Sequence, residues 1–165
     1  MHKEMENLKI IQIKDSANEF LPQVEQQFAE LYSFMKDKGL KLNLVEDGEK
    51  KWMNSIKKTI GKFVALFVVL DGKKVAGFVS GIVKFTPDYL GNQKVGFLSY
   101  HFVDKEYRGK GIGKSLLKSL ETWFKEKNIS SIEVQASFIN EYSRKYFEKN
   151  GYENELVQLR KFVKK

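Results

Sequence analysis

Three glycines stand close together in the segment VDKEYRGKGIGKSLL, residues 103–117. Gly109, Gly111 and Gly113 lack a Cβ, so this segment can turn tightly and bring several backbone N–H groups to one ligand. A strand is predicted before it and a helix after it, which places these amides at a helix N-terminus, where partial positive charge favours phosphate. The segment therefore predicts a site for a phosphate-bearing molecule, and an ordinary solvated turn is the alternative.

The spacing of the glycines excludes two common phosphate-binding patterns. A P-loop, G-x-x-x-x-G-K-[ST], matches Gly113, Lys114 and Ser115 but requires a glycine where Arg108 stands. A dinucleotide fingerprint, G-x-G-x-x-G, requires a glycine where Lys114 or Leu116 stands. Neither pattern is present in this segment.

The elements that position this segment follow from the periodicity of apolar residues. A strand is predicted at residues 8–13, and apolar residues at three- and four-residue spacing from Phe20 to Met35 predict a helix that ends near Gly39. A second helix is predicted over residues 49–60, where apolar side chains again recur on one side. Two helices therefore precede the central strands.

A β-hairpin is predicted in the middle of the chain. The runs FVALFVVL and KVAGFVSGIVKF flank Asp71-Gly72, a pair that accepts the positive φ angles of a tight turn. The later elements are predicted to be a strand at 95–103, a helix at 112–124, a strand at 131–134, a helix at 141–150 and a strand at 156–163. The order β-α-α-β-β-β-α-β-α-β predicts an α/β (α+β) fold with a mixed, mostly antiparallel sheet flanked by helices.

A third pattern, [RQ]-x-x-G-x-[GA] after a strand, fits at Arg108, Gly111 and Gly113. It resembles motif A of the GNAT superfamily of acyl-coenzyme A dependent N-acetyltransferases. The stretch NEYSRKYFEKNGY at residues 140–152 is similar to the family's N-x-x-A-x-x-F-Y-x-K-x-G-F segment, with Ser143 at the alanine place. Together with the order of elements, the resemblance covers nearly the whole chain.

The resemblance implies a single N-acetyltransferase domain over residues 1–165, in which the strands ending at Val103 and Val134 splay apart to admit the pantetheine arm of acetyl-CoA. It implies transfer of an acetyl group to a primary amine by direct attack in a ternary complex, with acetyl-CoA as co-substrate and no metal. The residues that it assigns to the cofactor are Phe102, Val103, Arg108, Gly109, Lys110, Gly111, Ile112, Gly113, Lys114, Asn140, Ser143 and Phe147.

The base for this reaction has several candidates on the strand before the glycines. Many relatives carry an acidic residue there, but here Ser99 and Tyr100 occupy those places. His101, whose ordinary pKa is near 6.5, suits a base at neutral pH, and a hydrogen-bonded core histidine is the alternative. Strand alternation predicts Ser99 and His101 on one face, with Leu98 and Tyr100 on the other.

The proton for the leaving thiolate usually comes, in this family, from the tyrosine of a Phe-Tyr pair in the last helix. Here the order is inverted: Tyr146 stands at the phenylalanine place and Phe147 at the tyrosine place, about 100° apart around the helix. Tyr146 is therefore the candidate acid, with water as the alternative. The inverted pair, together with the missing acid near Ser99, leaves a non-catalytic acyl-CoA sensor or regulatory subunit as the alternative function.

The composition of the chain excludes several other classes of protein and of functional site. The chain has 165 residues, 42% of them hydrophobic, which fits one domain, and the absence of cysteine excludes disulfides and thiol chemistry. Only His2 and His101 supply imidazole, so a multi-histidine metal site is not expected. The longest apolar run, 63–70, is too short to cross a bilayer and the first residues lack a signal-peptide pattern, so a cytoplasmic protein without a membrane partner is expected.

The net charge of +8 favours anionic partners, among them a phosphate-bearing cofactor or nucleic acid. Nucleic acid is not the expected partner, because the aromatic residues lie mostly on predicted core faces. The acceptor is expected to be a small-molecule or protein amine that contacts residues 16–60 and 85–94, and dimerisation is common in proteins that the chain resembles. The acids there either attract a cationic amine or are simply solvated: Glu46, Asp47, Glu49 and Asp88.

Overall fold

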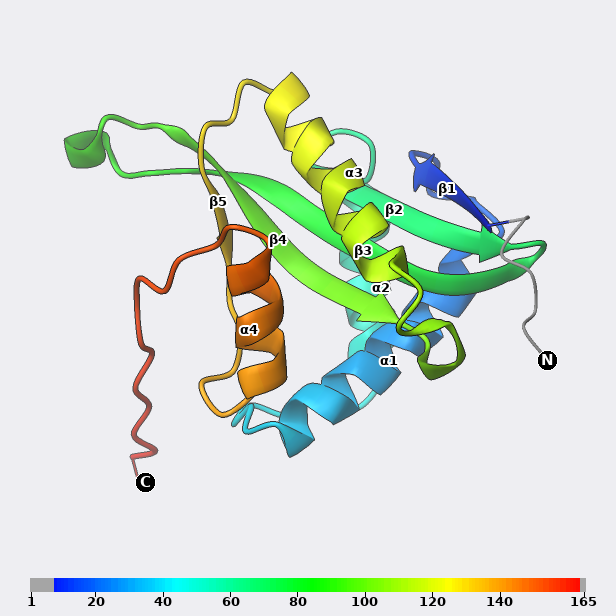
Figure 1. Ribbon diagram of the computed structural model, residues 1–165, viewed down its shortest axis with the longest axis horizontal. Coiled ribbons are helices and arrows are strands. Elements are labelled where there is room, and N and C mark those ends of the chain that lie inside the picture. The colour runs from blue at the N-terminus through cyan, green and yellow to red at the C-terminus, as the bar shows by residue number, and fades with distance from the viewer. Residues whose placement is uncertain (1–7, 164–165) are drawn as a thin grey trace.

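The structure, a computed structural model that describes residues 8–163, is built on one five-stranded sheet with the order β1-β2-β3-β4-β5 (Figure 1). The first three pairings are antiparallel, and only β4 and β5 run parallel. The predicted mixed, mostly antiparallel sheet is therefore confirmed. The strands are β1 (Leu8–Ile13), β2 (Val64–Asp71), β3 (Lys74–Phe85), β4 (Lys94–Val103) and β5 (Ile132–Val134).

Helices cover both faces of the sheet because each buries one apolar stripe against it. The helices are α1 (Leu21–Asp37) and α2 (Gly48–Thr59) on one face, α3 (Ile112–Glu126) and α4 (Glu141–Lys149) on the other, with short 3₁₀ turns at Asp88–Leu90 and Lys105–Tyr107. Figure 1 shows α3 and α4 in front of the sheet. None of the helices in residues 8–163 has both the length and the apolar character needed to cross a membrane.

Two glycines let α3 lie close to the sheet. A Cβ on Gly81 of β3 would stand 2.8 Å from the ring of Phe124, and a Cβ on Gly96 of β4 would stand 2.9 Å from the same ring. Both distances are too short for real carbon contacts, so any larger side chain would push α3 outward. The sequence signal for this close packing is the presence of glycine inside otherwise apolar strands.

A β-bulge interrupts β4 at Ser99. Consecutive residues of β3, Ser80 and Gly81, pair with Tyr100 and Leu98, so Ser99 has no residue opposite it. Such an extra residue breaks the two-residue alternation of a strand. Leu98 packs with α3, whereas Tyr100 packs against the cluster of α1 and α2. The prediction that Leu98 and Tyr100 share a face is therefore wrong, and the bulge is the reason.

The pairing of β4 with β5 is short. It consists of three residue pairs and ends where Leu98 meets Val134, so residues 99–103 of β4 have no β5 neighbour. The two strands therefore part immediately after the bulge. This is the divergence that the resemblance implied between the strands ending at Val103 and Val134.

The strand predicted over residues 156–163 is not formed. These residues have no regular secondary structure, and the exposed fractions of Leu156, Leu159 and Val163 are 89%, 90% and 84%. Their apolar pattern favours a strand, but a strand needs a neighbour for its backbone hydrogen bonds, and none pairs with it in residues 8–163. From β1 to α4 the observed element order agrees with the predicted one.

Candidate active site

The glycine segment forms an open turn between β4 and α3. Gly109 and Gly111 have φ angles of +75° and +78°, which glycine adopts without strain, and Gly111 is the N-cap of α3. The first backbone hydrogen bond of the helix runs from the amide of Ser115 to the carbonyl of Gly111, at 3.1 Å. Within the part of the chain that the structure describes, the amides of residues 109–114 donate no hydrogen bond. They are therefore available to an anion.

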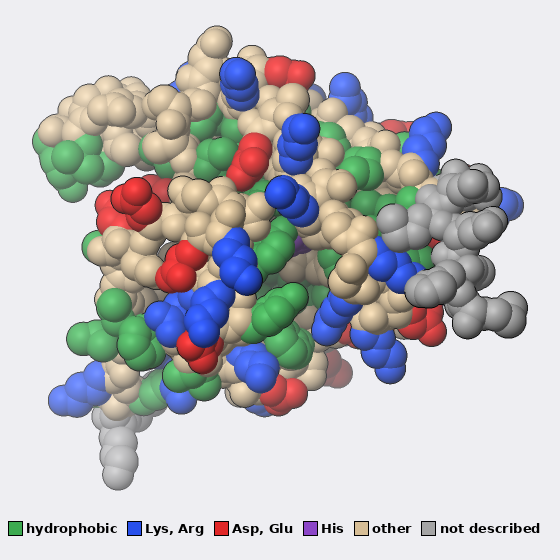
Figure 2. Space-filling model, in the orientation of Figure 1, with side chains coloured by type: hydrophobic (Ala, Val, Ile, Leu, Met, Phe, Trp, Pro, Cys, Tyr) green, Lys and Arg blue, Asp and Glu red, His purple; other side chains and the backbone are tan. Residues whose placement is uncertain are grey.

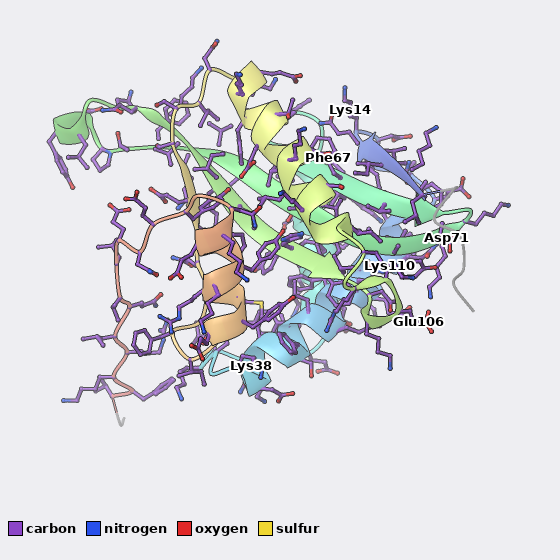
Figure 3. All side chains as sticks on the ribbon, viewed as in Figure 1. Lys14, Lys38, Phe67, Asp71, Glu106 and Lys110 are labelled. Atoms are coloured by element: carbon purple, nitrogen blue, oxygen red, sulfur yellow. The ribbon has the colours of Figure 1, made fainter. Side chains whose placement is uncertain are left out.

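Side-chain contacts fix the base of this turn to the sheet. The Nε of Arg108 donates to the carbonyl oxygen of Val103 at 2.8 Å, so the guanidinium ties the turn to the end of β4. Lys74 of β3 forms an ion pair with Glu106 at 2.7 Å. Figure 3 shows Asp71, Glu106 and Lys110 at this end of the sheet. The start of the segment is anchored, whereas Gly109, Gly111 and the lysines at 110 and 114 are exposed and Gly113 is half-buried.

The side chains of His101 and Tyr146 meet beside the first turn of α3, with ring centroids 5.6 Å apart. A Cβ placed on Gly113 would lie 3.5 Å from the Oη of Tyr146 and 3.6 Å from the Nε2 of His101, so both polar atoms face one point. Both atoms are shielded from solvent and neither has a hydrogen-bond partner in the described chain. Figure 2 shows part of the imidazole (purple) at the bottom of a recess between α3 and α4.

Burial sets the ionisation of both groups. It lowers the pKa of His101 to about 4, and the neighbouring backbone of Gly113 offsets only part of this effect. Burial and then the charge of Glu121 raise the pKa of Tyr146 to about 12. At neutral pH the recess therefore holds a neutral imidazole and a phenol that keeps its proton.

Tyr100 lies on the opposite face of the sheet from these two residues. It stands edge-on to the rings of Phe28 and Trp52, with centroids 4.9 Å and 5.7 Å away. Ser99 is the unpaired residue of the bulge, half-buried and without a side-chain hydrogen bond in the described chain. The predicted catalytic residues are thus divided: the structure brings His101 and Tyr146 together and places Tyr100 apart from them.

The last helix explains the inverted Tyr-Phe pair. Asn140 is its N-cap, and the Oδ1 of this residue accepts a hydrogen bond from the amide of Ser143 at 3.2 Å. Phe147 is 7% exposed and belongs to the core beneath α3, so it does not face the recess. Tyr146, one position earlier, points its hydroxyl into the recess in the observed register of α4.

Sequence reasoning missed a contact that joins the two sides of the strand gap. The hydroxyl of Ser137, in the loop before α4, donates to the carbonyl oxygen of Lys38 at the end of α1. A Cβ on Gly39 would stand 2.7 Å from the Cδ1 of Ile139, so these loops also pack closely. The partners are about a hundred positions apart, and no local pattern in the sequence indicates such a contact.

A cluster of metal-binding side chains is not found in residues 8–163, where no three His, Cys, Asp or Glu side chains gather suitably. The polar groups of the site are instead backbone amides, an imidazole and a phenol. These groups suit binding of an anionic, phosphate-bearing donor and transfer of a proton near the strand gap.

A comparison with protein families identifies the class of protein to which this fold belongs. The model of the acetyltransferase (GNAT) family matches residues 25–152. The chain belongs to the GNAT acetyltransferase family and is, as a member, an acyl-CoA-dependent N-acetyltransferase. A comparison with curated proteins finds no match.

Solved structures share the fold at low sequence identity. One is an aminoglycoside acetyltransferase, meta-AAC0020, from an uncultured soil metagenomic sample, 20% identical, with a TM-score of 0.69 over 96% of this chain and 97% of that chain. Another is the aminoglycoside N-acetyltransferase AAC(6')-Iy in complex with CoA, 18% identical, with a TM-score of 0.73 over 94% and 95%. A third is a tetramutant of the BH1408 protein from Bacillus halodurans, 16% identical, with a TM-score of 0.75 over 94% and 99%.

Proposed function

We propose that the protein transfers the acetyl group of acetyl-CoA to a primary amine by direct attack in a ternary complex. The observation that carries this proposal is the row of unpartnered amides at residues 109–114, next to a strand gap whose recess holds two unpartnered polar atoms. On this proposal residues 1–165 form one acetyltransferase domain that acts in the cytoplasm.

The donor is held mainly by backbone groups. The amides of residues 109–114 bind the pyrophosphate, with Lys110 and Lys114 adding positive charge at the rim. The edge of β4 at residues 99–103, which lacks a β5 neighbour, offers backbone groups at Phe102 and Val103 to the pantetheine arm. Arg108 acts through its hydrogen bond to Val103, which holds the turn in place. Asn140 and Ser143 border the arm from α4.

Acetyl transfer requires that the amine lose one proton and that the leaving thiolate gain one. The amine nitrogen forms a bond to the thioester carbonyl carbon, the carbon–sulfur bond breaks, and the thiolate takes up a proton. Tyr146 supplies that proton, because burial keeps its hydroxyl protonated. His101 is a weak base with a pKa of about 4, so it accepts a hydrogen bond at Nε2 while water carries the amine proton away. The hydroxyl of Ser99 at the bulge orients this water.

Calorimetric titration with acetyl-CoA, followed in the same tube by thiol release against a pooled amine panel, tests the proposal. Binding followed by release is the expected result. Binding without release from any amine would favour the non-catalytic acyl-CoA sensor. A failure to bind acetyl-CoA would overturn both functions. A folded Gly111→Ala variant, which should bind weakly, checks that the measured binding belongs to this turn.

We also propose that the protein is a homodimer joined through residues 155–163. The apolar side chains of this segment are exposed, and the segment makes no hydrogen bonds in the described chain (Figure 2, lower left). Leu159→Glu is expected to give a monomer in light scattering, because a buried charge would oppose pairing. Leu42→Glu, at another exposed leucine, is the control and should keep the dimer. A wild-type monomer would contradict the proposal.

A further inference from the structure

Aromatic side chains from three elements meet on the α1–α2 face of the sheet. The rings of Phe28 in α1 and Trp52 in α2 are stacked, with centroids 4.0 Å apart and planes at 7°. Tyr100 of β4 stands edge-on to both of them, at 87°. Tyr32, one helical turn after Phe28, lies 5.9 Å from that ring. These four residues form what we call the aromatic wall.

The aromatic wall has a buried base and an accessible rim. Phe28 is 1% exposed, whereas Trp52, Tyr32 and Tyr100 are half-buried. The hydroxyl of Tyr32 donates to the carbonyl of Leu42 at 3.1 Å, but the hydroxyl of Tyr100 has no hydrogen-bond partner in the described chain. Burial raises the pKa of Tyr100, so this hydroxyl is protonated and free to pair with a ligand at neutral pH.

The rim lies beside the strand gap. Tyr100 is two positions past Leu98, the last residue of β4 that pairs with β5. It projects to the face opposite His101, its neighbour in the strand, as the two-residue alternation requires. The contact between the loop before α4 and Lys38 connects the α1–α2 region to the other side of the gap. A substrate that approaches the gap from the α1–α2 face therefore meets the aromatic wall.

Net charge does not distinguish acceptors on this face. Residues 16–60, which include α1 and α2, contain seven lysines and seven acidic residues, a net charge of zero. One of the acids, Asp47, is paired with Lys50 at 2.7 Å. Discrimination between acceptors on this face therefore depends on the rings of the aromatic wall.

We propose that the acceptor is a primary amine carried on a flat apolar or aromatic group, whose ring lies against Tyr100 and Trp52. The proposal rests on the proposed acetyl transfer and names its substrate class. Edge-on and stacked aromatic contacts stabilise such a ring beyond the burial of its area, and the hydroxyl of Tyr100 can bond a polar group on the ligand. The amine gains the acetyl group and loses one proton, and the donor leaves as the free thiol.

Thiol release with acetyl-CoA, measured with three primary amines, tests this acceptor class. The amines are 2-phenylethylamine, ethanolamine and tobramycin. The expected kcat/KM is at least about tenfold higher for 2-phenylethylamine than for either of the others. Equal or faster release with ethanolamine or tobramycin would overturn the proposal and leave acetyl transfer standing. If no amine gives thiol release, the proposed acetyl transfer fails. Calorimetric titration of the protein–CoA complex with 2-phenylethylamine then tests the acceptor class separately. Absence of binding in that titration would overturn the proposed acceptor class.

Two variants at Tyr100 test whether its ring causes the preference for 2-phenylethylamine. Tyr100→Leu removes the ring and should reduce the preference for 2-phenylethylamine over ethanolamine from at least about tenfold to less than about twofold. Tyr100→Phe keeps the ring and should retain most of that preference, which separates lost stacking from lost folding. Phe63→Leu, at an exposed phenylalanine just before β2, is the control and should leave the preference unchanged. An unchanged preference in a folded Tyr100→Leu protein would overturn the assignment.

Discussion

The two faces of β4 beside the strand gap present different chemical groups to a ligand. On the α3–α4 face, the groups that can act on a ligand are the amides of residues 109–114 and the polar atoms of His101 and Tyr146. On the α1–α2 face, the corresponding groups are the rings of Tyr100, Trp52 and Tyr32. The first face suits a donor of fixed structure, and the second suits discrimination between acceptors.

This difference separates general from specific recognition. Backbone amides bind phosphate whatever side chains surround them, so a turn of fixed geometry can serve any acyl-CoA-dependent transferase. Aromatic rings bind by shape and area, so their number and position decide which acceptor fits. Variants on the donor face should therefore affect all acceptors alike, whereas variants of the aromatic wall should affect acceptors differently.

The largest expected effect on the donor face is that of Tyr146→Phe. Removing the hydroxyl that faces Gly113 should lower kcat by about 100-fold and leave KM nearly unchanged, because the lost proton donor acts only in the reaction. The fall should be the same for every amine in steady-state thiol release. Tyr142→Phe, at an exposed tyrosine of the same helix, is the control. If kcat fell by different factors for different acceptors, the proposed difference between the two faces would be wrong.

The buried imidazole of the donor face should make stability depend on pH. Because the folded pKa of His101 is about 4 and the unfolded value is near 6.5, the unfolded chain binds more protons between these values. The free energy of unfolding should therefore fall by roughly 2 kcal/mol as pH drops from 6.5 to 4, with no contribution from this group above that window. Urea unfolding of the wild type and of His101→Gln at several pH values measures this fall. If the free energy of unfolding depended equally on pH in both proteins, His101 would not be the group responsible.

A smaller effect is expected from the turn that is proposed to hold the donor. Gly111→Ala puts a Cβ on a residue with φ of +78°, so the turn should relax and the Kd for acetyl-CoA should rise about tenfold. Gly72→Ala carries the same kind of strain at φ of +59° in the β2–β3 turn, again with no atom near the new Cβ. It should lower thermal stability similarly and leave the Kd unchanged. Equal Kd values in both variants would remove the turn from the site.

The smallest expected effect is that of Arg108→Ala. Loss of its hydrogen bond to the carbonyl of Val103 should raise the Kd for acetyl-CoA about fivefold, the equivalent of about 1 kcal/mol. Lys9→Ala, at an exposed lysine of β1, removes the same charge and is the control for long-range attraction of the donor. If both variants raise the Kd equally in calorimetry, Arg108 acts only through its charge.

Local sequence features predicted most of the fold, including the glycine turn between β4 and α3. The hairpin at Asp71-Gly72, the long helix periodicity and the glycine spacing all depend on neighbours within a few positions, so they are visible in the sequence. The strand predicted over 156–163 was wrong for a related reason. Its alternation is a local property, but strand formation depends on an adjacent edge, which no local pattern supplies.

The bulge at Ser99 shows what the sequence could not provide. An extra residue in β4 changes no composition and no obvious pattern, yet it places Leu98 and Tyr100 on opposite faces of the sheet, whereas alternation predicts them on one face. The partnership of His101 with Tyr146 was likewise hidden, because the two are 45 positions apart and meet only when α4 packs beside α3.

The sequence by itself determined the family motifs, the element order up to α4 and the glycine turn before α3, because each depends on glycine geometry or on periodic burial along one stretch of chain. Tertiary structure alone decided which polar atoms lose their solvent, which face each β4 side chain occupies and which rings surround the gap. The physical reason is that burial and contact depend on distances between elements, and the chain encodes these only through the packing of the whole fold.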